Sequence, residues 1–557
     1  MTAANRYPFR EEMPVRDNTV EARRFGCPSC GGTLRYDIES RKLVCDQCGR
    51  TAMPSMFPDE AGDAGSETFG VTAYRCPSCG AEICSAGTDA TSFCSFCGSD
   101  VVLEQRLSEM QRPSRIVPFS VTREKCEEIY RRYIRAHDLA PRALLRQAEL
   151  AHFRPVYIPF WSYSVQAEGE ITVEGSVRSS RRGGDVCQEE VRLRLGTHIR
   201  QDNILYDASV AFEDETAARL LHASENAVPF HPVYLSGMFA QAPDAPPDYY
   251  RNEAAAAALR LFMDRVHMEY RMDSVRLVGD SLPDERIDQE LVLMPVWLLA
   301  RRQGDRVLYA AVNGADGRVV CDVPASPVKL GLATAAAAAL LFALLIMLPT
   351  IRADWLIVPS TLLALLTHHR LCIMQRLLVY RELREGEPAF NGSAYRNGPA
   401  QTLLALHRYR YRKDGQDPPI KQVGKVLMLL AVGPLVLLLG YLLAATDLYA
   451  GDAALRLITA VFLLIAGVIG HRLSIRLIRA MPACRAKLSA TRQCLLLIAV
   501  NILAILLLIL NLAEDWVYYL VSLILLGLSV GGMVLLWRHY NRFATRPVPF
   551  FDKEEAA

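Results

Sequence analysis

Cys27-Pro-Ser-Cys30 and Cys45-Asp-Gln-Cys48 form the first of two matching sets of cysteines near the start of this 557-residue chain. The second set is Cys76-Pro-Ser-Cys79 and Cys94-Ser-Phe-Cys97. In both sets 14 residues separate the two pairs, a glycine follows every pair, and the sets repeat after 49 residues. This repeated spacing decides how residues 27–112 fold.

Each Cys-x-x-Cys pair makes a tight turn that points both sulfurs at one centre, and the glycine after it tolerates a positive φ. The 14-residue separation allows a short hairpin to bring the second pair opposite the first. Four thiolates around one ion give a closed tetrahedral zinc site, and binding of that ion supplies folding energy. The sequence therefore predicts two structural Zn²⁺ ions with these ligands: Cys27, Cys30, Cys45, Cys48, Cys76, Cys79, Cys94 and Cys97.

Other uses of these cysteines fit less well. The chain starts with a polar stretch and no apolar signal run, so we expect residues 1–329 to stay in the reducing cytoplasm, where disulfides are rare. A thioredoxin-type redox centre needs one pair in a βαβ unit, and rubredoxin-like iron sites usually have a longer separation. Because four-cysteine sites leave no open position for water or substrate, we also expect no catalytic metal.

Charge argues against nucleic acid as a partner of these ribbons. Residues 1–112 contain 12 Lys/Arg and 16 Asp/Glu, and residues 1–329 contain 39 against 47, a balance of −8. A phosphate backbone requires a basic face, and each four-thiolate zinc site adds a further two negative charges. We therefore expect the ribbons to bind another protein or to serve the fold.

The remaining sequence divides by composition. We expect a polar tail at 1–26, zinc ribbons at 27–50 and 71–112 joined by a linker at 51–70, and a β-rich α/β cytoplasmic domain at 113–329. In that domain, residues 121–137 and 253–270 have helical spacing, residues 171–199 read as a hairpin, and residues 294–324 read as a meander of three strands. The chain ends with a transmembrane domain at 330–537 and a cytoplasmic tail at 538–557.

Long uncharged stretches rule out a wholly soluble protein. Residues 330–348, 426–446, 494–513 and 516–537 each carry at least 19 residues without a charge, enough for a membrane-spanning helix. Two shorter stretches, 355–367 and 457–470, complete a predicted set of six spans. The alternative for these two is an amphipathic or re-entrant segment.

The loop charges predict the orientation. The loops at 370–425 and 472–492 hold 11 and six Lys/Arg, whereas the intervening loops hold one or none. By the positive-inside rule, both termini and both basic loops lie in the cytoplasm. We therefore expect a multi-pass protein of the inner (cytoplasmic) membrane with almost nothing exposed outside.

Two common catalytic motifs are missing. The sequence contains no phosphate-binding loop and no zinc-protease motif. His368 and His369 can be ligands or proton carriers, but a polar end to a short span is the favoured explanation. Asn501 lies inside an apolar span and is expected to hydrogen-bond to a neighbouring helix, with a transport role as the alternative. No span has a central charge of the kind that ion-coupled transporters use.

Several short motifs follow the ribbons: Ile116-Val-Pro-Phe119, Phe153-Arg-Pro-Val-Tyr-Ile-Pro-Phe-Trp161, Pro229-Phe230, Tyr234-Leu-Ser-Gly237, Pro295-Val-Trp297 and residues 309–317. With the ribbons, they resemble the bacterial TFIIB-type zinc-ribbon multi-pass membrane proteins, which are often mislabelled as replication restart (primosomal) helicases. The resemblance covers residues 27–330. It implies the eight cysteine ligands, no catalytic residues, and association with PspA-type membrane-stress proteins and SPFH-like or virion-core-like proteins.

Three hypotheses for function follow. The first is a non-enzymatic membrane anchor or scaffold that presents zinc ribbons to cytoplasmic proteins. The second is a transporter or lipid-handling protein with a regulatory ribbon head. The third, a DNA-associated regulator, requires a basic face somewhere on residues 1–329.

Overall fold

The computed structural model describes residues 25–57, 67–85, 94–100, 104–180, 186–209, 214–220, 226–272, 274–281, 286–346, 356–385, 452–481, 484–511 and 514–548. The chain divides into two compact units. The first contains Met1–Tyr133, Leu145–Cys321 and Val548–Ala557, and the second contains Ile134–Leu144 and Asp322–Pro547.

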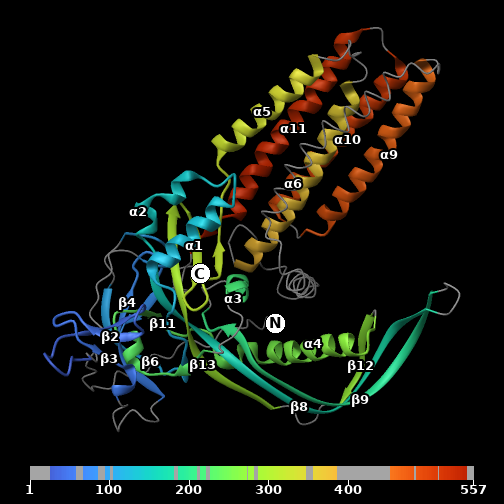
Figure 1. Cartoon of the computed structure of the whole chain (residues 1–557). Coiled ribbons are helices and arrows are strands. Elements are labelled where there is room, and N and C mark those ends of the chain that lie inside the picture. Colours follow the sequence, from blue (N-terminus) through green and yellow to red (C-terminus); the bar gives the residue numbers. More distant parts are fainter. Residues whose placement is uncertain are drawn as a thin grey trace, which may run out of the picture. The chain divides into compact units, whose positions relative to one another are not determined.

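The first cysteine set lies on a small antiparallel sheet of its own (Figure 1). In this sheet β2 (Lys42–Cys45) pairs with both β1 (Leu34–Asp37) and β3 (Thr51–Ala52). Leu34 and Leu43 are fully buried and provide most of its apolar core. This core is small, and the contribution of a bound ion to the folding energy of the sheet stays a prediction.

The second cysteine set belongs to the large sheet of the first unit. The main strand order is β10-β7-β13-β8-β11-β5-β4-β6; in addition β9 and β12 pair with β8, and β14 pairs with β13 and β15. The strands are β4 Thr68–Arg75, β5 Glu82–Ser85, β6 Glu104–Gln111, β7 Arg115–Ile116, β8 Arg154–Ser180, β9 Val186–Asp207, β10 Val228–Pro229, β11 Phe239–Gln241, β12 Ser274–Ser281, β13 Arg286–Gln303, β14 Arg306–Asn313 and β15 Val319–Cys321. Pairing of β5 with β11 continues the sheet across the predicted boundary at residue 112.

The central strand β13 is covered on both faces. Ten consecutive residues, Leu291–Ala300, are buried, which is typical of a strand between two packed layers. β13 pairs antiparallel with β8 and β14, and β14 pairs antiparallel with β15. The meander predicted for residues 294–324 is therefore confirmed.

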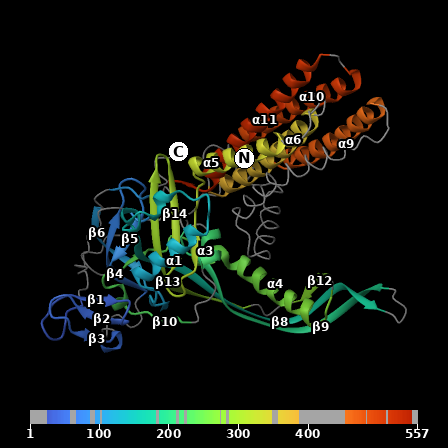
Figure 2. The ribbon, with the colours of Figure 1, turned by 45° about the horizontal axis from the view of Figure 1, so that its top comes forward.

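A long curved hairpin extends from this sheet (Figure 2). It is formed by β8 and β9, whose pairs run from Phe160↔Asp207 to Ser180↔Val186. Helix α4 (Arg251–Glu269) lies along the hairpin, with its small residue Ala258 buried in the same cluster as Tyr163. The hairpin and the second helix predicted from the sequence are thus confirmed.

Several of the short motifs meet around the buried ring of Phe119. Its centroid lies 5.0 Å from that of Tyr157 and 5.7 Å from that of Trp297, in edge-to-face contacts. The indole Nε1 of Trp297 donates to the Val121 carbonyl at 2.8 Å. Helix α1 (Arg123–Arg135) begins two residues later and confirms the first predicted helix. A Cβ at Gly314 would lie 2.4 Å from the Phe119 ring, so this motif glycine is required by packing.

The remaining helices of the first unit are short. They are α2 (Gln147–Leu150) and α3 (Asp214–Leu220). The main-chain carbonyl of Leu220 accepts a hydrogen bond from the Asn313 side chain at 3.0 Å, which ties the end of α3 to β14.

The second unit is a bundle of long helices (Figure 1). Its helices are α5 Pro327–Ile346, α6 Ile357–Glu385, α9 Asp452–Arg479, α10 Arg485–Leu510 and α11 Asp515–Phe543. Four segments of the described chain are long and apolar enough to cross a membrane: Ile357–Val379, Arg456–Arg479, Ala486–Leu510 and Asp515–Phe543.

These four segments match four of the six predicted spans, including the two short stretches. Both short stretches lie in continuous helices, α6 and α9, that run well past the last uncharged residue. The first predicted span falls in α5, and the span at 426–446 lies outside the described residues. The number six therefore stays a prediction.

The segment that follows β15 is held by the ends of the helices. Asp322 lies between Arg381 of α6 and Arg546, at 3.7 and 3.0 Å, and all three side chains are nearly buried. The Asn541 side chain bonds both the N–H and the carbonyl of Ala325, at 2.8 and 3.2 Å. Residues 322–325 are thus fixed to α6 and α11 within the second unit.

Candidate metal centres

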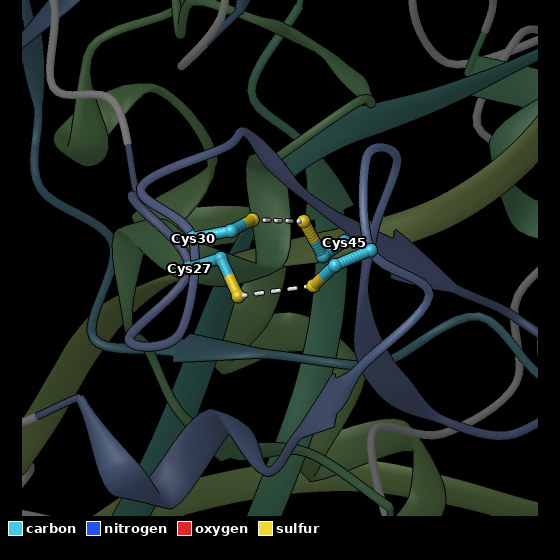
Figure 3. Close-up of side chains that lie close together, drawn as sticks. Cys27, Cys30 and Cys45 are labelled. Atoms are coloured by element: carbon cyan, nitrogen blue, oxygen red, sulfur yellow. Dashed lines mark hydrogen bonds between the residues drawn. The ribbon is translucent and has the colours of Figure 1, made fainter.

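The structure brings together all eight predicted cysteines in two groups of four. In each group the sulfur atoms lie within 4.8 Å of one another and can hold one metal ion. In the first, Cys27–Cys48 and Cys30–Cys45 are 3.7 and 3.5 Å apart between sulfurs (Figure 3). In the second, the corresponding sulfurs of Cys76–Cys97 and Cys79–Cys94 are each 3.8 Å apart. A disulfide bond requires about 2.05 Å, so these distances describe ligand cages rather than crosslinks.

All four Cys-x-x-Cys turns share one backbone geometry. The glycine after each pair has a positive φ, between +65° and +73°, as the sequence predicts: Gly31, Gly49, Gly80 and Gly98. Its N–H donates to the carbonyl of the first cysteine of the pair, at 2.8–3.0 Å. Backbone N–H groups also point at the sulfurs, as from Ser29 to Cys27 at 3.5 Å and from Phe96 to Cys94 at 3.4 Å. These donors stabilise thiolates over thiols.

The two centres differ in burial. Cys30 and Cys48 of the first centre are exposed, whereas all four cysteines of the second are buried. The second centre shares its hydrophobic cluster with central residues of the large sheet, including Val156 and Val296. The second centre is therefore part of the core of the first unit, and the first centre lies at its surface.

Close contacts fix the second centre against β13 and β14. A Cβ at Gly98 would lie 2.7 Å from the carbonyl oxygen of Ala300, so the turn approaches the β13 backbone directly. The Tyr309 hydroxyl of β14 donates to the carbonyl of Phe96, inside the last Cys-x-x-Cys pair. The sheet thereby determines where this pair sits.

An arginine joins the two turns of each centre. At the second, Arg302 Nη1 donates to Ser78 Oγ at 2.9 Å and to Ser99 Oγ at 2.7 Å, and Ser99 in turn contacts the Cys97 sulfur at 3.2 Å. At the first, Arg50 Nη1 donates to Ser29 Oγ at 2.6 Å. The guanidinium groups offset part of the negative charge of four thiolates, and such outer partners hold ligands in place. Sequence analysis missed both arginines.

The first ribbon docks on one of the short motifs. The N–H of Tyr36 donates to the Ser236 carbonyl at 3.0 Å, and the Ser236 hydroxyl donates to the Leu34 carbonyl. The rings of Tyr36 and Tyr234 lie 5.6 Å apart. The motif Tyr234-Leu-Ser-Gly237 therefore serves to hold the first ribbon, a role that its letters alone did not indicate.

Neighbouring groups shift the pKa values of the cysteine thiols in different directions. The Ser29 N–H lowers the pKa of the Cys27 thiol to about 6. In the second centre, the Cys76 sulfur lowers the pKa of Cys97 but raises that of Cys79. Four thiolates this close repel one another, and a divalent cation among them removes the repulsion.

Other candidate donor side chains lie outside the two groups. Cys84, which stands between the two pairs of the second set in sequence, is buried in β5 opposite Ala240 and belongs to neither group. His368 and His369 lie on α6, and Asn501 lies on α10 with its amide nitrogen 2.3 Å from the place of a Cβ at Gly467 in α9. Asn501 therefore contacts a neighbouring helix, but its Oδ1 has no hydrogen-bond partner in the described part of the chain, so the expected hydrogen bond stays a prediction.

Comparison with known proteins finds one informative similarity. No family model matches the chain, and no solved structure matches it. The chain is 26% identical over 311 residues to "Uncharacterized protein YdjG" of Bacillus subtilis (strain 168). The match covers 55% of this chain and 91% of that protein. That name assigns no activity.

Proposed function

We propose that this protein is a non-enzymatic, multi-pass membrane scaffold that presents a zinc-loaded ribbon to cytoplasmic protein partners. Both centres hold Zn²⁺ in this proposal. In a tetrahedral site with Zn–S bonds of about 2.3 Å, neighbouring sulfurs are about 3.8 Å apart, close to the spacing of the paired sulfurs here. Four cysteines complete the coordination shell, so the ions are structural and carry no chemistry.

The apolar helices anchor the chain in the inner membrane with both termini in the cytoplasm. The basic residues of the loops support this orientation through the positive-inside rule. Residues 1–329 then form a head with a net charge of −8. Anionic lipid and nucleic acid both repel such a head, which leaves it available to proteins and disfavours the DNA-associated regulator.

The observation that carries the proposal is the exposure of the first ribbon. The segment that follows its last cysteine pair also exposes Met53 and Met56, with 45% and 67% of their surfaces accessible. Met53 directly follows β3, which among the described residues pairs only with β2 and so presents an open edge. Exposed methionines beside an open strand edge are typical of protein-binding surfaces.

The resemblance supplies candidate partners. Proteins of the PspA type and SPFH-like or virion-core-like proteins are the soluble proteins that we expect this surface to recruit. Recruitment to the membrane would place the protein in a membrane-stress response.

A double variant of the full chain, Met53→Asp with Met56→Asp, tests the proposal. We expect a tagged PspA-like or SPFH-like protein encoded nearby to co-purify with the wild type, to lie at the membrane, and to lose both properties with the variant. The variant Met268→Asp is the control, because Met268 is 70% exposed on α4, away from the ribbon. Unchanged co-purification and location with the double variant would refute the scaffold.

A transporter or lipid-handling function is the second candidate. It is favoured by polar atoms buried within the helical unit, among them Asn501 Oδ1 and Thr361 Oγ1, which have no hydrogen-bond partner in the described chain. If no soluble partner co-purifies with the wild type, and vesicles with the purified protein move lipid or solute faster than empty vesicles, this function replaces the scaffold.

A further inference from the structure

The helical unit contains a cluster of side chains that can bind metal where α6, α9 and α10 meet. On α6, His368 and Cys372 are four residues apart and therefore share one helix face. Their Nε2 and Sγ atoms are 3.5 Å apart, and both side chains are buried. A histidine and a cysteine in this arrangement form a two-point chelate for a soft metal ion.

Helix α9 presents a third donor next to this pair, although the three ligand atoms do not all lie within 4.8 Å of one another. His471 is 91% buried, and neither of its ring nitrogens has a hydrogen-bond partner in the described part of the chain. The residue before it, Gly470, faces Leu365 of α6, which lies about one turn before His368: a Cβ at Gly470 would be 3.4 Å from the Leu365 side chain. A buried imidazole with two unpaired nitrogens is costly in apolar surroundings unless it has a ligand.

Helix α10 contributes a fourth donor. Cys494 is 3% exposed and packs in one cluster with Cys372 and Ile478. The cluster thus offers two imidazoles and two thiols, from His368, Cys372, His471 and Cys494. None of the four is an oxygen donor of the kind that Mg²⁺ or Ca²⁺ requires.

We propose that this cluster is a third metal site, which binds one Zn²⁺ ion between α6, α9 and α10. Two thiolates and two neutral imidazoles balance the charge of Zn²⁺, so the site is neutral and tolerable among apolar helices. A four-cysteine site would carry two negative charges, which fits the two centres of the other unit. The chelate of α6 is already formed, and the ion would draw His471 and Cys494 onto it and so lock three helices together.

Zinc content per chain tests the site in the full-length protein purified in detergent. We expect three ions in the wild type and two in each of Cys372→Ser and His471→Gln. His369→Gln and Cys484→Ser are matched controls on or beside the same helices and outside the cluster, and they should keep three. Three ions in the cluster variants, or two in the wild type, would overturn the site.

X-ray absorption at the zinc edge identifies the ligand atoms around zinc in the wild-type protein. The ribbon centres give sulfur ligands only, whereas the proposed site adds nitrogen scattering from imidazole. Nitrogen should be seen in the wild type and should disappear in a His368→Gln, His471→Gln double variant. All-sulfur coordination of the wild-type zinc would refute this site while leaving the two ribbon centres and the scaffold function intact.

Discussion

Gly49 and Gly98 occupy equivalent positions in the two ribbons, yet their neighbourhoods differ. Both have a left-handed φ, near +69° and +65°, but a Cβ meets no atom within 4 Å at Gly49 and the Ala300 carbonyl at 2.7 Å at Gly98. Alanine at Gly49 should therefore cost only the strain of that φ, about 1–2 kcal/mol. Gly98→Ala should cost more, because the β13 backbone cannot move aside.

Metal content after purification measures the difference. We expect Gly49→Ala to retain the zinc of the wild type and Gly98→Ala to lose the ion of the second centre. Equal zinc in the two variants would mean that the turn does not depend on its approach to β13.

The two arginines allow a reciprocal prediction. Arg302→Ala removes bonds to Ser78 and Ser99 only at the second centre, and Arg50→Ala removes the bond to Ser29 only at the first. Each hydrogen bond to a charged group contributes about 1.5–3 kcal/mol, so each variant should speed zinc release from its own centre roughly tenfold or more.

Release to a chromogenic chelator, followed over time, separates the centres because the exposed first centre should release its ion sooner. Arg302→Ala should accelerate only the slow phase, and Arg50→Ala only the fast one. Identical effects of both variants would contradict the assignment.

For single residues, the sequence predicts the features that are formed by neighbours along the chain. The eight cysteines and their glycines follow from spacing, since each turn is made within a few residues. Arg302 could not be found in this way, because it lies 203 residues from Ser99 and meets it only when β13 lies against the second ribbon. The burial of one centre and the exposure of the other have the same long-range origin.

Within the second unit, the segment that precedes α5 is held by one carboxylate. Asp322 is paired with Arg381 and Arg546, and its side chain is only 11% exposed. Removing one partner of a buried ion pair costs about 3–5 kcal/mol because the remaining charge is left unpaired. We expect Asp322→Ala to lower the thermal midpoint of the detergent-purified protein by several degrees.

Asp316→Ala is the matched control. Asp316 pairs with Arg318 where both side chains are about 45% exposed, and exposed pairs contribute less than about 1 kcal/mol. Equal midpoints for both variants would show that the buried pair contributes little.

The ends of the helices make the orientation testable. Asp452 and Asp515 begin α9 and α11, and Arg485 begins α10. Single cysteines at Asp452 or Asp515 should react with an impermeant label from outside, because their loops carry no Lys or Arg. Cysteines at Lys413, Arg485 or Glu554 should stay protected, and external labelling at Lys413 would overturn the orientation.

Helix lengths show why the two short spans were ambiguous in sequence. An uncharged run of 13 or 14 residues is too short to span, but α6 and α9 continue for 29 and 28 residues in total. Their ends carry histidines and arginines. These residues lower the hydropathy of the segment, but they do not end a helix. Strand order was beyond prediction for a related reason, since the pairing of β5 with β11 joins segments about 150 residues apart.

At the scale of the whole first unit, loss of the second centre should unfold more of the structure than loss of the first. Cys94→Ser removes a ligand from the core of the large sheet, whereas Cys45→Ser affects a ribbon with its own small sheet. We expect limited trypsin digestion to leave a resistant fragment of about the size of the unit in Cys45→Ser and none in Cys94→Ser. A resistant fragment of equal yield in both would show that the sheet does not need the second ion.

The contacts of the second ribbon also set an order of events during synthesis. Its strands leave the ribosome early, but they complete their pairing only when β11 has emerged, and Phe96 meets its partner Tyr309 later still. Pro327, where α5 begins, follows only 18 residues after Tyr309. A ribosome adds about 5–20 residues per second, so the sheet stays unfinished until about the time the first apolar helix is synthesised. Nascent chains therefore expose a half-built sheet for many seconds, and early capture of zinc by Cys76–Cys97 would give that fragment a folded nucleus while it waits.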